Sequence, residues 1–125
     1  MYDREQSYPW ESFHACRELE LPALGIPEAY GGAGADMVSY VLALEEIAAA
    51  DGGLSTVMSV NNSPDCAALL AYGTAAQKER WLKPMARGEV LGAFCLTEPH
   101  AGSDALGART RADLAADGSH YILNG

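Results

Sequence analysis

The sequence predicts an α+β protein in which an α-helical bundle precedes the first strands of an incomplete sheet. Apolar residues recur at three- and four-residue spacing through the first two-thirds of the 125-residue chain. After Gly88 this pattern changes to short apolar segments bounded by turn signals, which are typical of strands. We therefore expect an α-helical domain over residues 1–88 and the start of a β domain over residues 89–125.

Capping residues and prolines divide the helical part. Ser7 is expected to cap a first helix and Asp36 to cap the clearest one, because a short polar side chain can accept a hydrogen bond from a first-turn N–H. Pro64 is expected to separate two short helices, since proline disfavours a helical residue before it. Thr74 and Gln77 have the spacing of a capping box, which predicts the start of another helix.

The last third of the chain is expected to contain strands. Residues 89–97, EVLGAFCLT, are short, apolar and aromatic, which suits a buried strand. Asp117-Gly118 is a turn signal, and it predicts a hairpin between residues 108–116 and 120–123. A two-stranded hairpin is marginally stable alone. We therefore expect the sequence to be a piece of a larger fold.

Charge and cysteine content exclude several classes of function. The formal net charge of −9 argues against a nucleic-acid partner and against an anionic membrane surface, since both need a basic face. No apolar run approaches the roughly 20 residues of a membrane span, and the N-terminus lacks the apolar core of a secretory signal. Cys16, Cys66 and Cys95 are widely spaced without a CxxC pair, which favours a reduced cytoplasmic setting and no metal site.

The segment LTEPHAGSD, residues 96–104, has the composition of a binding loop. Pro99 cannot donate to a strand ladder, so the preceding strand is expected to stop there. Gly102 permits close backbone approach, while the hydroxyls of Thr97 and Ser103 are donors. Such a loop can hold the edge of a flat heteroaromatic ring or a phosphate. An ordinary turn with capping hydroxyls is the alternative, and the residues taken alone favour it.

A family resemblance favours the binding loop over the ordinary turn. Residues 93–112, AFCLTEPHAGSDALGARTRA, closely resemble the signature of the acyl-CoA dehydrogenases, flavoenzymes that desaturate acyl-CoA thioesters. The likeness extends in order over nearly the whole chain, through LGIPEAYGGAG, LALEEIAAADGGLSTVMSVNNS, YGTAAQKERWLKPMARGE and DGSHYILNG. It implies an N-terminal helical domain followed by a β-barrel domain, of which only the first strands are present here. It also implies a C-terminal helical domain that this sequence lacks.

The resemblance implies FAD as cofactor and identifies candidate site residues. Phe94, Leu96 and Thr97 would contact the flavin, with the Thr97 hydroxyl near its reactive nitrogen. Gly102 would keep the approach open, and Ser103 would contact the cofactor or the acyl-CoA substrate. The two hydroxyls are therefore expected to face one ligand. No catalytic residue is assigned within this chain, because the family's catalytic base lies in the C-terminal domain.

Other polar residues receive structural or secondary roles. Asp104 is expected to bond loop N–H groups, and Glu98 to be structural and to face away from the flavin. Asn61, Asn62 and Ser63 fall where the family's helical domain approaches the acyl pocket, and they are candidate lining residues or plain structural ones.

The function expected is that of an FAD-dependent acyl-CoA dehydrogenase in fatty-acid or branched-chain β-oxidation. The usual electron acceptor would be electron-transferring flavoprotein, and the full-length protein would be a homo-oligomer. A non-catalytic remnant or split-gene partner subunit is the first alternative, and a stand-alone helical interaction module is the second. This piece alone is expected to bind FAD weakly or not at all, because half of the pocket is missing.

Overall fold

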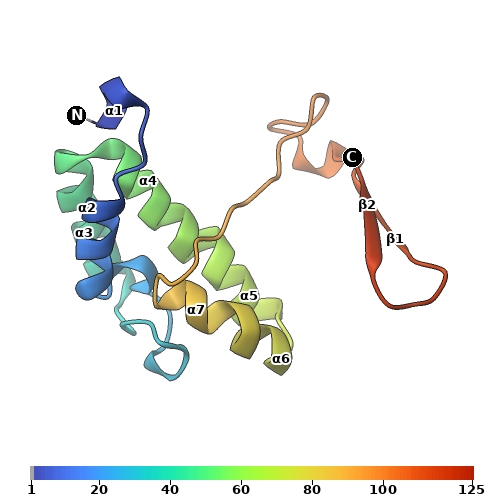
Figure 1. The fold of residues 1–125 in the computed structure, drawn as a ribbon, viewed down its shortest axis with the longest axis horizontal. Helices are drawn as coiled ribbons and strands as arrows, with labels where there is room; N and C mark the ends of the chain where they lie inside the picture. Colours follow the sequence, from blue (N-terminus) through green and yellow to red (C-terminus); the bar gives the residue numbers. More distant parts are fainter. Residues whose placement is uncertain (1) are drawn as a thin grey trace. The chain divides into compact units, whose positions relative to one another are not determined.

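The computed structural model of the protein describes residues 2–125. The chain forms two compact units, Met1–Phe94 and Cys95–Gly125. The first unit is helical and the second contains a two-stranded antiparallel sheet (Figure 1). The expected α+β class, with a helical domain followed by the first strands of an incomplete β domain, is confirmed.

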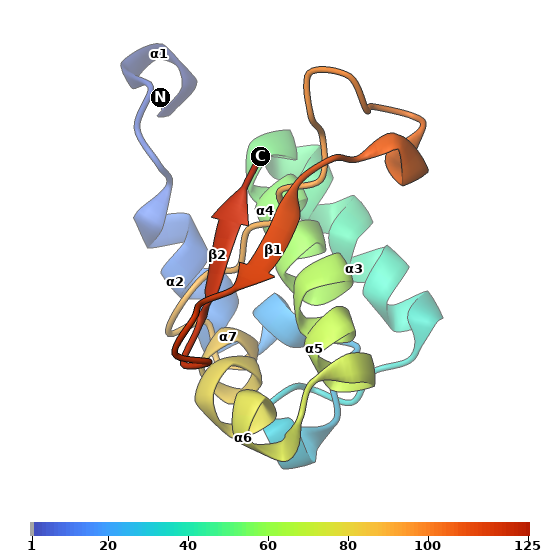
Figure 2. The ribbon, with the colours of Figure 1, turned by 90° about the vertical axis from the view of Figure 1, so that its right-hand side faces the viewer.

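The helices of the first unit are joined by short connections. In chain order they are α1 (Tyr2–Glu5), α2 (Trp10–Glu18), the 3₁₀ turns η1 (Leu21–Ala23) and η2 (Glu28–Tyr30), α3 (Met37–Ala50), α4 (Gly52–Val60), the π-helical η3 (Asn61–Cys66), α5 (Ala67–Tyr72), α6 (Ala75–Gln77), the π-helical η4 (Lys78–Leu82) and α7 (Lys83–Ala86). Figure 2 shows α4 and α5 following one another along a continuous path through η3. Among the described residues, none of the helices is both long and apolar enough to cross a membrane.

Side-chain caps begin three of these helices. The Asp36 carboxylate accepts a hydrogen bond from the Ser39 N–H at 2.8 Å, and Thr74 and Gln77 form a complete capping box, so both expectations are confirmed. Asp51 follows the last residue of α3. Its carboxylate caps α4 by accepting a hydrogen bond from the Leu54 N–H at 2.9 Å. Each cap satisfies a donor that the helix itself leaves free.

The expected helix start at Ser7 is wrong. α2 begins at Trp10 with Pro9 as its N-cap, and no side chain caps it. Pro9 has no N–H, and its carbonyl already accepts the Phe13 N–H, so the helix starts without a polar side chain. The expected division at Pro64 is confirmed, because Ser63 leaves the helical conformation with φ −150° and ψ 118°.

Two apolar clusters form the core of the first unit. One contains Phe13, Cys16, Leu54 and Met58, and the other contains Ala23, Ile26, Cys66, Leu82, Met85 and Ala86. Two buried amides on η3 bind backbone carbonyls of η1 and α7. Asn61 donates to the carbonyls of Pro22 and Met85, at 2.9 and 3.2 Å, and Asn62 donates to the carbonyl of Leu21 at 3.2 Å.

The second unit contains η5 (Ala105–Gly107) and the hairpin of β1 (Arg111–Leu114) and β2 (Tyr121–Asn124). Arg111 pairs with Asn124 and Leu114 with Tyr121, in antiparallel register. The two strands run side by side in Figure 2. The hairpin expected here is confirmed.

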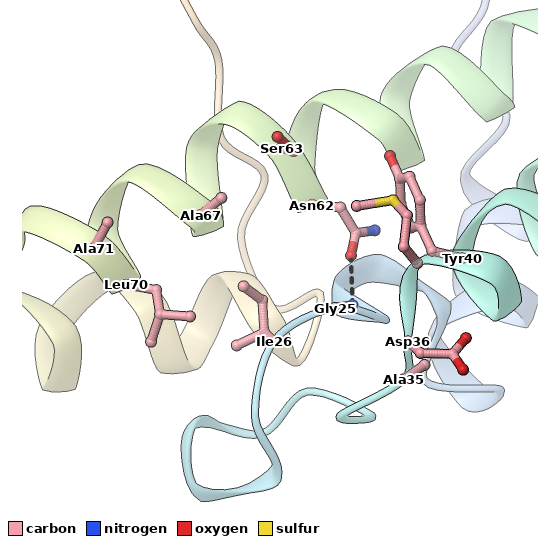
Figure 3. Close-up of a pocket in the computed structure, with 11 residues that line it drawn as sticks. Gly25, Ile26, Ala35, Asp36, Tyr40, Asn62, Ser63, Ala67, Leu70 and Ala71 are labelled. Atoms are coloured by element: carbon pink, nitrogen blue, oxygen red, sulfur yellow. Dashed lines mark hydrogen bonds between the residues drawn. The ribbon is translucent and has the colours of Figure 1, made fainter.

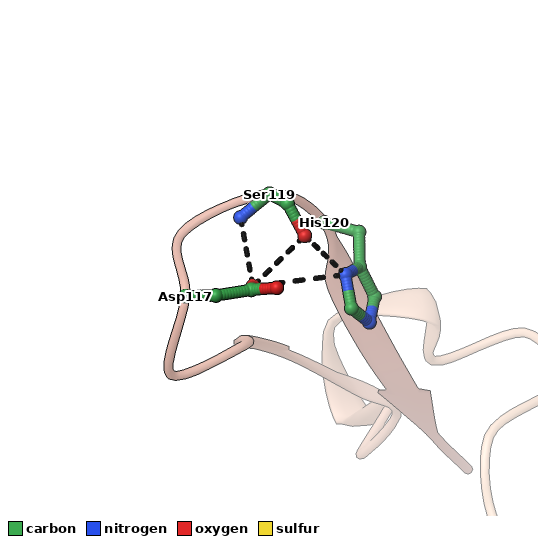
Figure 4. A network of polar contacts seen from close by, with 3 residues as sticks. All are labelled: Asp117, Ser119 and His120. Carbon is green, nitrogen blue, oxygen red and sulfur yellow. Dashed lines mark hydrogen bonds and ion pairs between the residues drawn. The ribbon is translucent and has the colours of Figure 1, made fainter.

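The hairpin turn is held by polar side chains (Figure 4). The Asp117 carboxylate accepts hydrogen bonds from the N–H and the hydroxyl of Ser119, at 3.0 and 2.8 Å. The same hydroxyl lies 2.8 Å from Nδ1 of His120. Gly118 has φ +70°, a left-handed conformation that glycine adopts without steric cost.

The expected strand over residues 89–97 is wrong for this chain. Residues 91–97 have no regular secondary structure. A segment becomes a strand only through a ladder of hydrogen bonds with a neighbour, and none of the described residues supplies that ladder to 91–97. Apolar composition is compatible with a strand, but pairing decides whether one forms.

Candidate functional site

The binding-loop segment contains a turn that is closed by its own backbone. The Glu98 N–H donates to the Ala101 carbonyl at 3.0 Å, and the Ala101 N–H donates to the Glu98 carbonyl at 3.1 Å. Pro99 and the exposed His100 form the tip, where no backbone donor is needed. The chain therefore turns back immediately after Thr97, as the proline predicted.

The Glu98 side chain ties this turn to the start of the hairpin. Its carboxylate accepts hydrogen bonds from the Arg109 N–H at 2.7 Å, from the Thr110 N–H at 2.9 Å and from the Thr110 hydroxyl at 2.5 Å. These hydrogen bonds stabilise the ionised form and lower the pKa of Glu98, with the Thr110 hydroxyl as the largest cause. The structural role expected of Glu98 is confirmed.

The role expected of Asp104 is wrong. Asp104 precedes η5, but its carboxylate makes no cap hydrogen bond there. Its backbone carbonyl instead accepts the Gly107 N–H at 3.0 Å. The side chain that bonds loop N–H groups is that of Glu98, which reaches residues 11 and 12 positions further along the chain.

Two hydroxyls without a hydrogen-bond partner among the described residues lie next to the closed turn in the sequence. Thr97 precedes it and Ser103 follows it, and both residues are exposed. Among residues 2–125, neither hydroxyl has a hydrogen-bond partner within the protein. A Cβ added to Gly102 would meet no atom within 4 Å, so the chain's own packing does not require glycine there. Hydroxyl donors and bare backbone are thus available to a ligand on this loop.

Exposed apolar side chains precede the turn. Phe94 is 53% exposed and Leu96 is 45% exposed, although both are large apolar residues. Leu96, Thr97, Gly102 and Ser103 lie in the second unit, whereas Phe94 is the last residue of the first. The side chains present fit the needs of a flavin, which combines a flat apolar ring with a polar edge that accepts hydrogen bonds.

A cavity of about 400 Å³ lies within the helical unit (Figure 3). Asn62 and Ser63 line it together with Tyr40 and Leu70, whereas Asn61 does not. The Asn62 side-chain oxygen accepts the Gly25 N–H at 3.4 Å, so this bond joins two residues of the lining. Asn62 therefore has a structural role as well as a position on a cavity wall, and the assignment of this trio to an acyl pocket stays a prediction.

One cluster in the helical unit was missed by sequence reasoning. The Asn61 side-chain oxygen accepts the Gly92 N–H at 3.2 Å, and the buried Asp65 carboxyl packs against the same glycine. Burial raises the pKa of Asp65, whose Oδ2 has no hydrogen-bond partner. A glycine inside an apolar segment often marks close backbone approach, and this was the available signal. Within residues 2–125, no group of three or more metal-ligating side chains could hold a metal ion.

Comparison with known proteins identifies the family. The model of the acyl-CoA dehydrogenase N-terminal domain matches residues 1–89. The mouse mitochondrial short-chain specific acyl-CoA dehydrogenase is 42% identical over 123 residues, which are 98% of this chain and 29% of the mouse protein. The chain thus spans less than a third of the length of this relative.

Solved structures agree with this match. An acyl-CoA dehydrogenase complexed with FAD from Bacillus anthracis superposes with a TM-score of 0.83 at 41% identity, over 90% of this chain and 19% of that one. A chain in the structure of the electron transferring flavoprotein of Acidaminococcus fermentans superposes with a TM-score of 0.90 at 39% identity, over 99% of this chain and 32% of that one. The chain therefore belongs to the acyl-CoA dehydrogenase family, whose members are FAD-dependent oxidoreductases.

Proposed function

We propose that this chain is the N-terminal part of an FAD-dependent acyl-CoA dehydrogenase that desaturates an acyl-CoA thioester between its α and β carbons. In this proposal residues 1–88 form the N-terminal helical domain and residues 89–125 begin the middle β-barrel domain. Family membership supports it, since the match covers 98% of the chain. The observation that carries it is the closed turn from Glu98 to Ala101, which the exposed Thr97 precedes and the exposed Ser103 follows in sequence.

The chain's own residues would bind and orient the cofactor. Phe94 and Leu96 provide exposed apolar surface for the flavin ring, and the Thr97 hydroxyl donates a hydrogen bond to its polar edge. Gly102 leaves room for close approach, and Ser103 contacts the cofactor or the acyl-CoA. Bound FAD supplies the acceptor for the hydride that leaves the β carbon. A hydroxyl donor beside the flavin would stabilise the negative charge of the reduced ring with little reorganisation.

The remaining assignments belong to the whole protein. No residue of this chain is assigned as the base that removes the α-proton, so desaturation requires residues outside it. Electron-transferring flavoprotein is the proposed electron acceptor, and the likeness to a chain from the Acidaminococcus fermentans structure supports it. A homo-oligomer in the cytoplasm, acting in fatty-acid or branched-chain β-oxidation, completes the proposal.

A chimera tests this function. The 125-residue chain replaces the matching N-terminal segment of the mouse short-chain enzyme, which it resembles over 123 residues. The purified chimera is expected to carry FAD and to bleach the flavin absorbance when an acyl-CoA is added. The 125-residue chain alone is expected to bind FAD weakly or not at all.

Two substitutions localise the effect. Thr97→Val removes one hydroxyl while keeping the side-chain shape, and it is expected to weaken FAD binding by about tenfold, the cost of one hydrogen bond. Ser39→Ala removes an exposed hydroxyl on α3 and serves as the matched control. A folded chimera without flavin, or equal effects of both substitutions, would contradict the proposal.

A further inference from the structure

Gly92 is held where the chain leaves the helical unit. Its N–H donates to the Asn61 side-chain oxygen at 3.2 Å. Asn61 is 1% exposed, and its amide nitrogen donates to the carbonyls of Pro22 and Met85, at 2.9 and 3.2 Å. These three hydrogen bonds fix the orientation of the amide, because turning it over would present two carbonyls to its oxygen and leave buried groups unpaired.

The Asp65 carboxyl forms the second half of this contact. Asp65 lies four residues after Asn61 on η3 and is only 9% exposed. A Cβ added to Gly92 would lie 2.3 Å from Asp65 Oδ2 and 2.5 Å from Met85 Cε. The backbone at residue 92 thus fits against Asp65 only because glycine has no side chain.

Stability does not account for an acid at this position. Asp65 Oδ2 is buried without a hydrogen-bond partner, an arrangement that costs free energy. Departures of this kind from ordinary packing rules concentrate at functional positions. What Asp65 contacts is therefore informative, and it contacts the glycine two residues before Phe94.

We propose that Asn61 and Asp65 are positioning residues of the flavin site, which hold Gly92 and so fix the backbone that presents the Phe94 ring. This inference rests on the proposed function, because it takes Phe94 as a flavin contact. Two residues span at most about 7 Å of chain. A displacement of Gly92 therefore also displaces Phe94, because so short a segment cannot compensate for it. A misplacement of about 1 Å in a binding site is enough to weaken function severely.

Gly92→Ala tests the inference in the chimera described above. The new methyl group meets Asp65 Oδ2, so the chain must move, and the FAD dissociation constant is expected to rise about tenfold or more. Adding Asp65→Gly removes both the carboxylate and the Cβ that lies 2.8 Å from the new methyl group. The double variant keeps the Asn61 hydrogen bond to residue 92 but lacks the Asp65 contact, so its FAD affinity is expected to lie between those of Gly92→Ala and the unsubstituted chimera.

Two controls separate positioning from general stability. Gly52→Ala adds a methyl group that meets no atom within 4 Å and is expected to leave FAD affinity unchanged. Asp51→Ala removes the α4 cap, which lowers stability without touching Gly92, and is also expected to leave FAD affinity unchanged. In the 125-residue chain, amide exchange at residue 92 is expected to accelerate in Asn61→Ala by about tenfold more than in Asp51→Ala.

Each result of these experiments either supports or overturns the positioning role. FAD affinity within about twofold of the unsubstituted value in Gly92→Ala overturns the inference while leaving the proposed function intact. Equal weakening by Asp51→Ala also overturns it, because stability alone would then explain the effect. If the unsubstituted chimera takes up no FAD, the proposed function fails and the inference fails with it. Weakening by Gly92→Ala that the double variant reverses only in part supports the inference even if Asn61→Ala does not fold, whereas full reversal would remove Asp65 from it.

Discussion

The carboxylate of Glu98 accepts hydrogen bonds from both the backbone N–H and the hydroxyl of Thr110, although the two residues lie 12 positions apart. The Arg109 N–H donates to the other carboxylate oxygen. The loop between them, which contains Gly102 and Ser103, is therefore tied at both ends by one side chain. The Glu98 carboxylate thus fixes the backbone of this loop at Arg109 and Thr110.

Glu98→Gln is expected to loosen this loop, because the amide nitrogen cannot accept an N–H. Hydrogen bonding lowers the pKa of Glu98 below its usual 4.5 in the folded protein. Its stabilising contribution is therefore present above pH 4.5 and is lost as the pH falls through the folded value. The Thr110 amide shift, followed by NMR, is expected to titrate below pH 4.5 in the wild type and to lose this transition in Glu98→Gln. An unchanged titration would exclude the contact, and Glu46→Gln on the exposed face of α3 is the control.

Several interactions between neighbours in sequence were predictable, although the cap expected at Ser7 was not. Asp36 caps α3 and Thr74 with Gln77 caps α6, because the partners of each cap lie three residues apart. The hairpin turn at Asp117-Gly118 is equally local. Such contacts depend on a few dihedral angles, so a short motif specifies them.

Interactions between distant segments were not predictable in the same way. Asp104 and Glu98 are both acids within the motif, and the sequence does not tell which one meets the N–H groups at Arg109 and Thr110. The contact between Asn61 and Gly92 spans 31 positions and depends on how α7 packs beside η3. The strand expected over residues 89–97 was wrong for a related reason. A strand requires a neighbouring strand, and the sequence of the segment does not specify one.

Gly32→Ala is expected to destabilise the helical unit. A Cβ at this position would lie 2.1 Å from the Ile26 carbonyl oxygen and 2.6 Å from that of Ala23, and backbone atoms cannot move aside cheaply. The free energy of unfolding in urea should fall by roughly 1–3 kcal/mol. Gly25→Ala is the control in the same loop, where the added methyl group meets no atom within 4 Å. Its stability should be unchanged or higher by up to about 1 kcal/mol, and equal losses in both variants would contradict the packing explanation.

The three cysteines are expected to fall into two classes of reactivity toward thiol reagents. Cys66 is fully buried, and burial together with the neighbouring Asp65 raises the pKa of its thiol to about 12. Cys16 is buried and its pKa is raised by burial, whereas Cys95 is exposed. Because the thiolate is the reactive form, a disulfide reagent at neutral pH should modify Cys95 in the folded chain and the other two only on unfolding. Cys95→Ser should abolish the fast phase, and rapid labelling of Cys66 in that variant would show that its surroundings open in solution.

Asp65→Asn is expected to stabilise the chain at neutral pH. Burial raises the pKa of Asp65 above its usual 3.8, so the folded state favours the protonated form. The carboxyl costs no ionisation free energy below pH 3.8, where it is protonated in both states. Stability is then lost as the pH rises through the folded pKa. The amide keeps the shape of the acid without its charge, so the free energy of unfolding at pH 7 should rise by about 1 kcal/mol. This gain should disappear below pH 3.8, as measured by urea unfolding across the pH range.

Asp104→Asn, at an exposed carboxylate without a cap hydrogen bond, is the control and should show no such gain. A gain for Asp65→Asn that persisted at low pH would show that loss of the charge is not its cause.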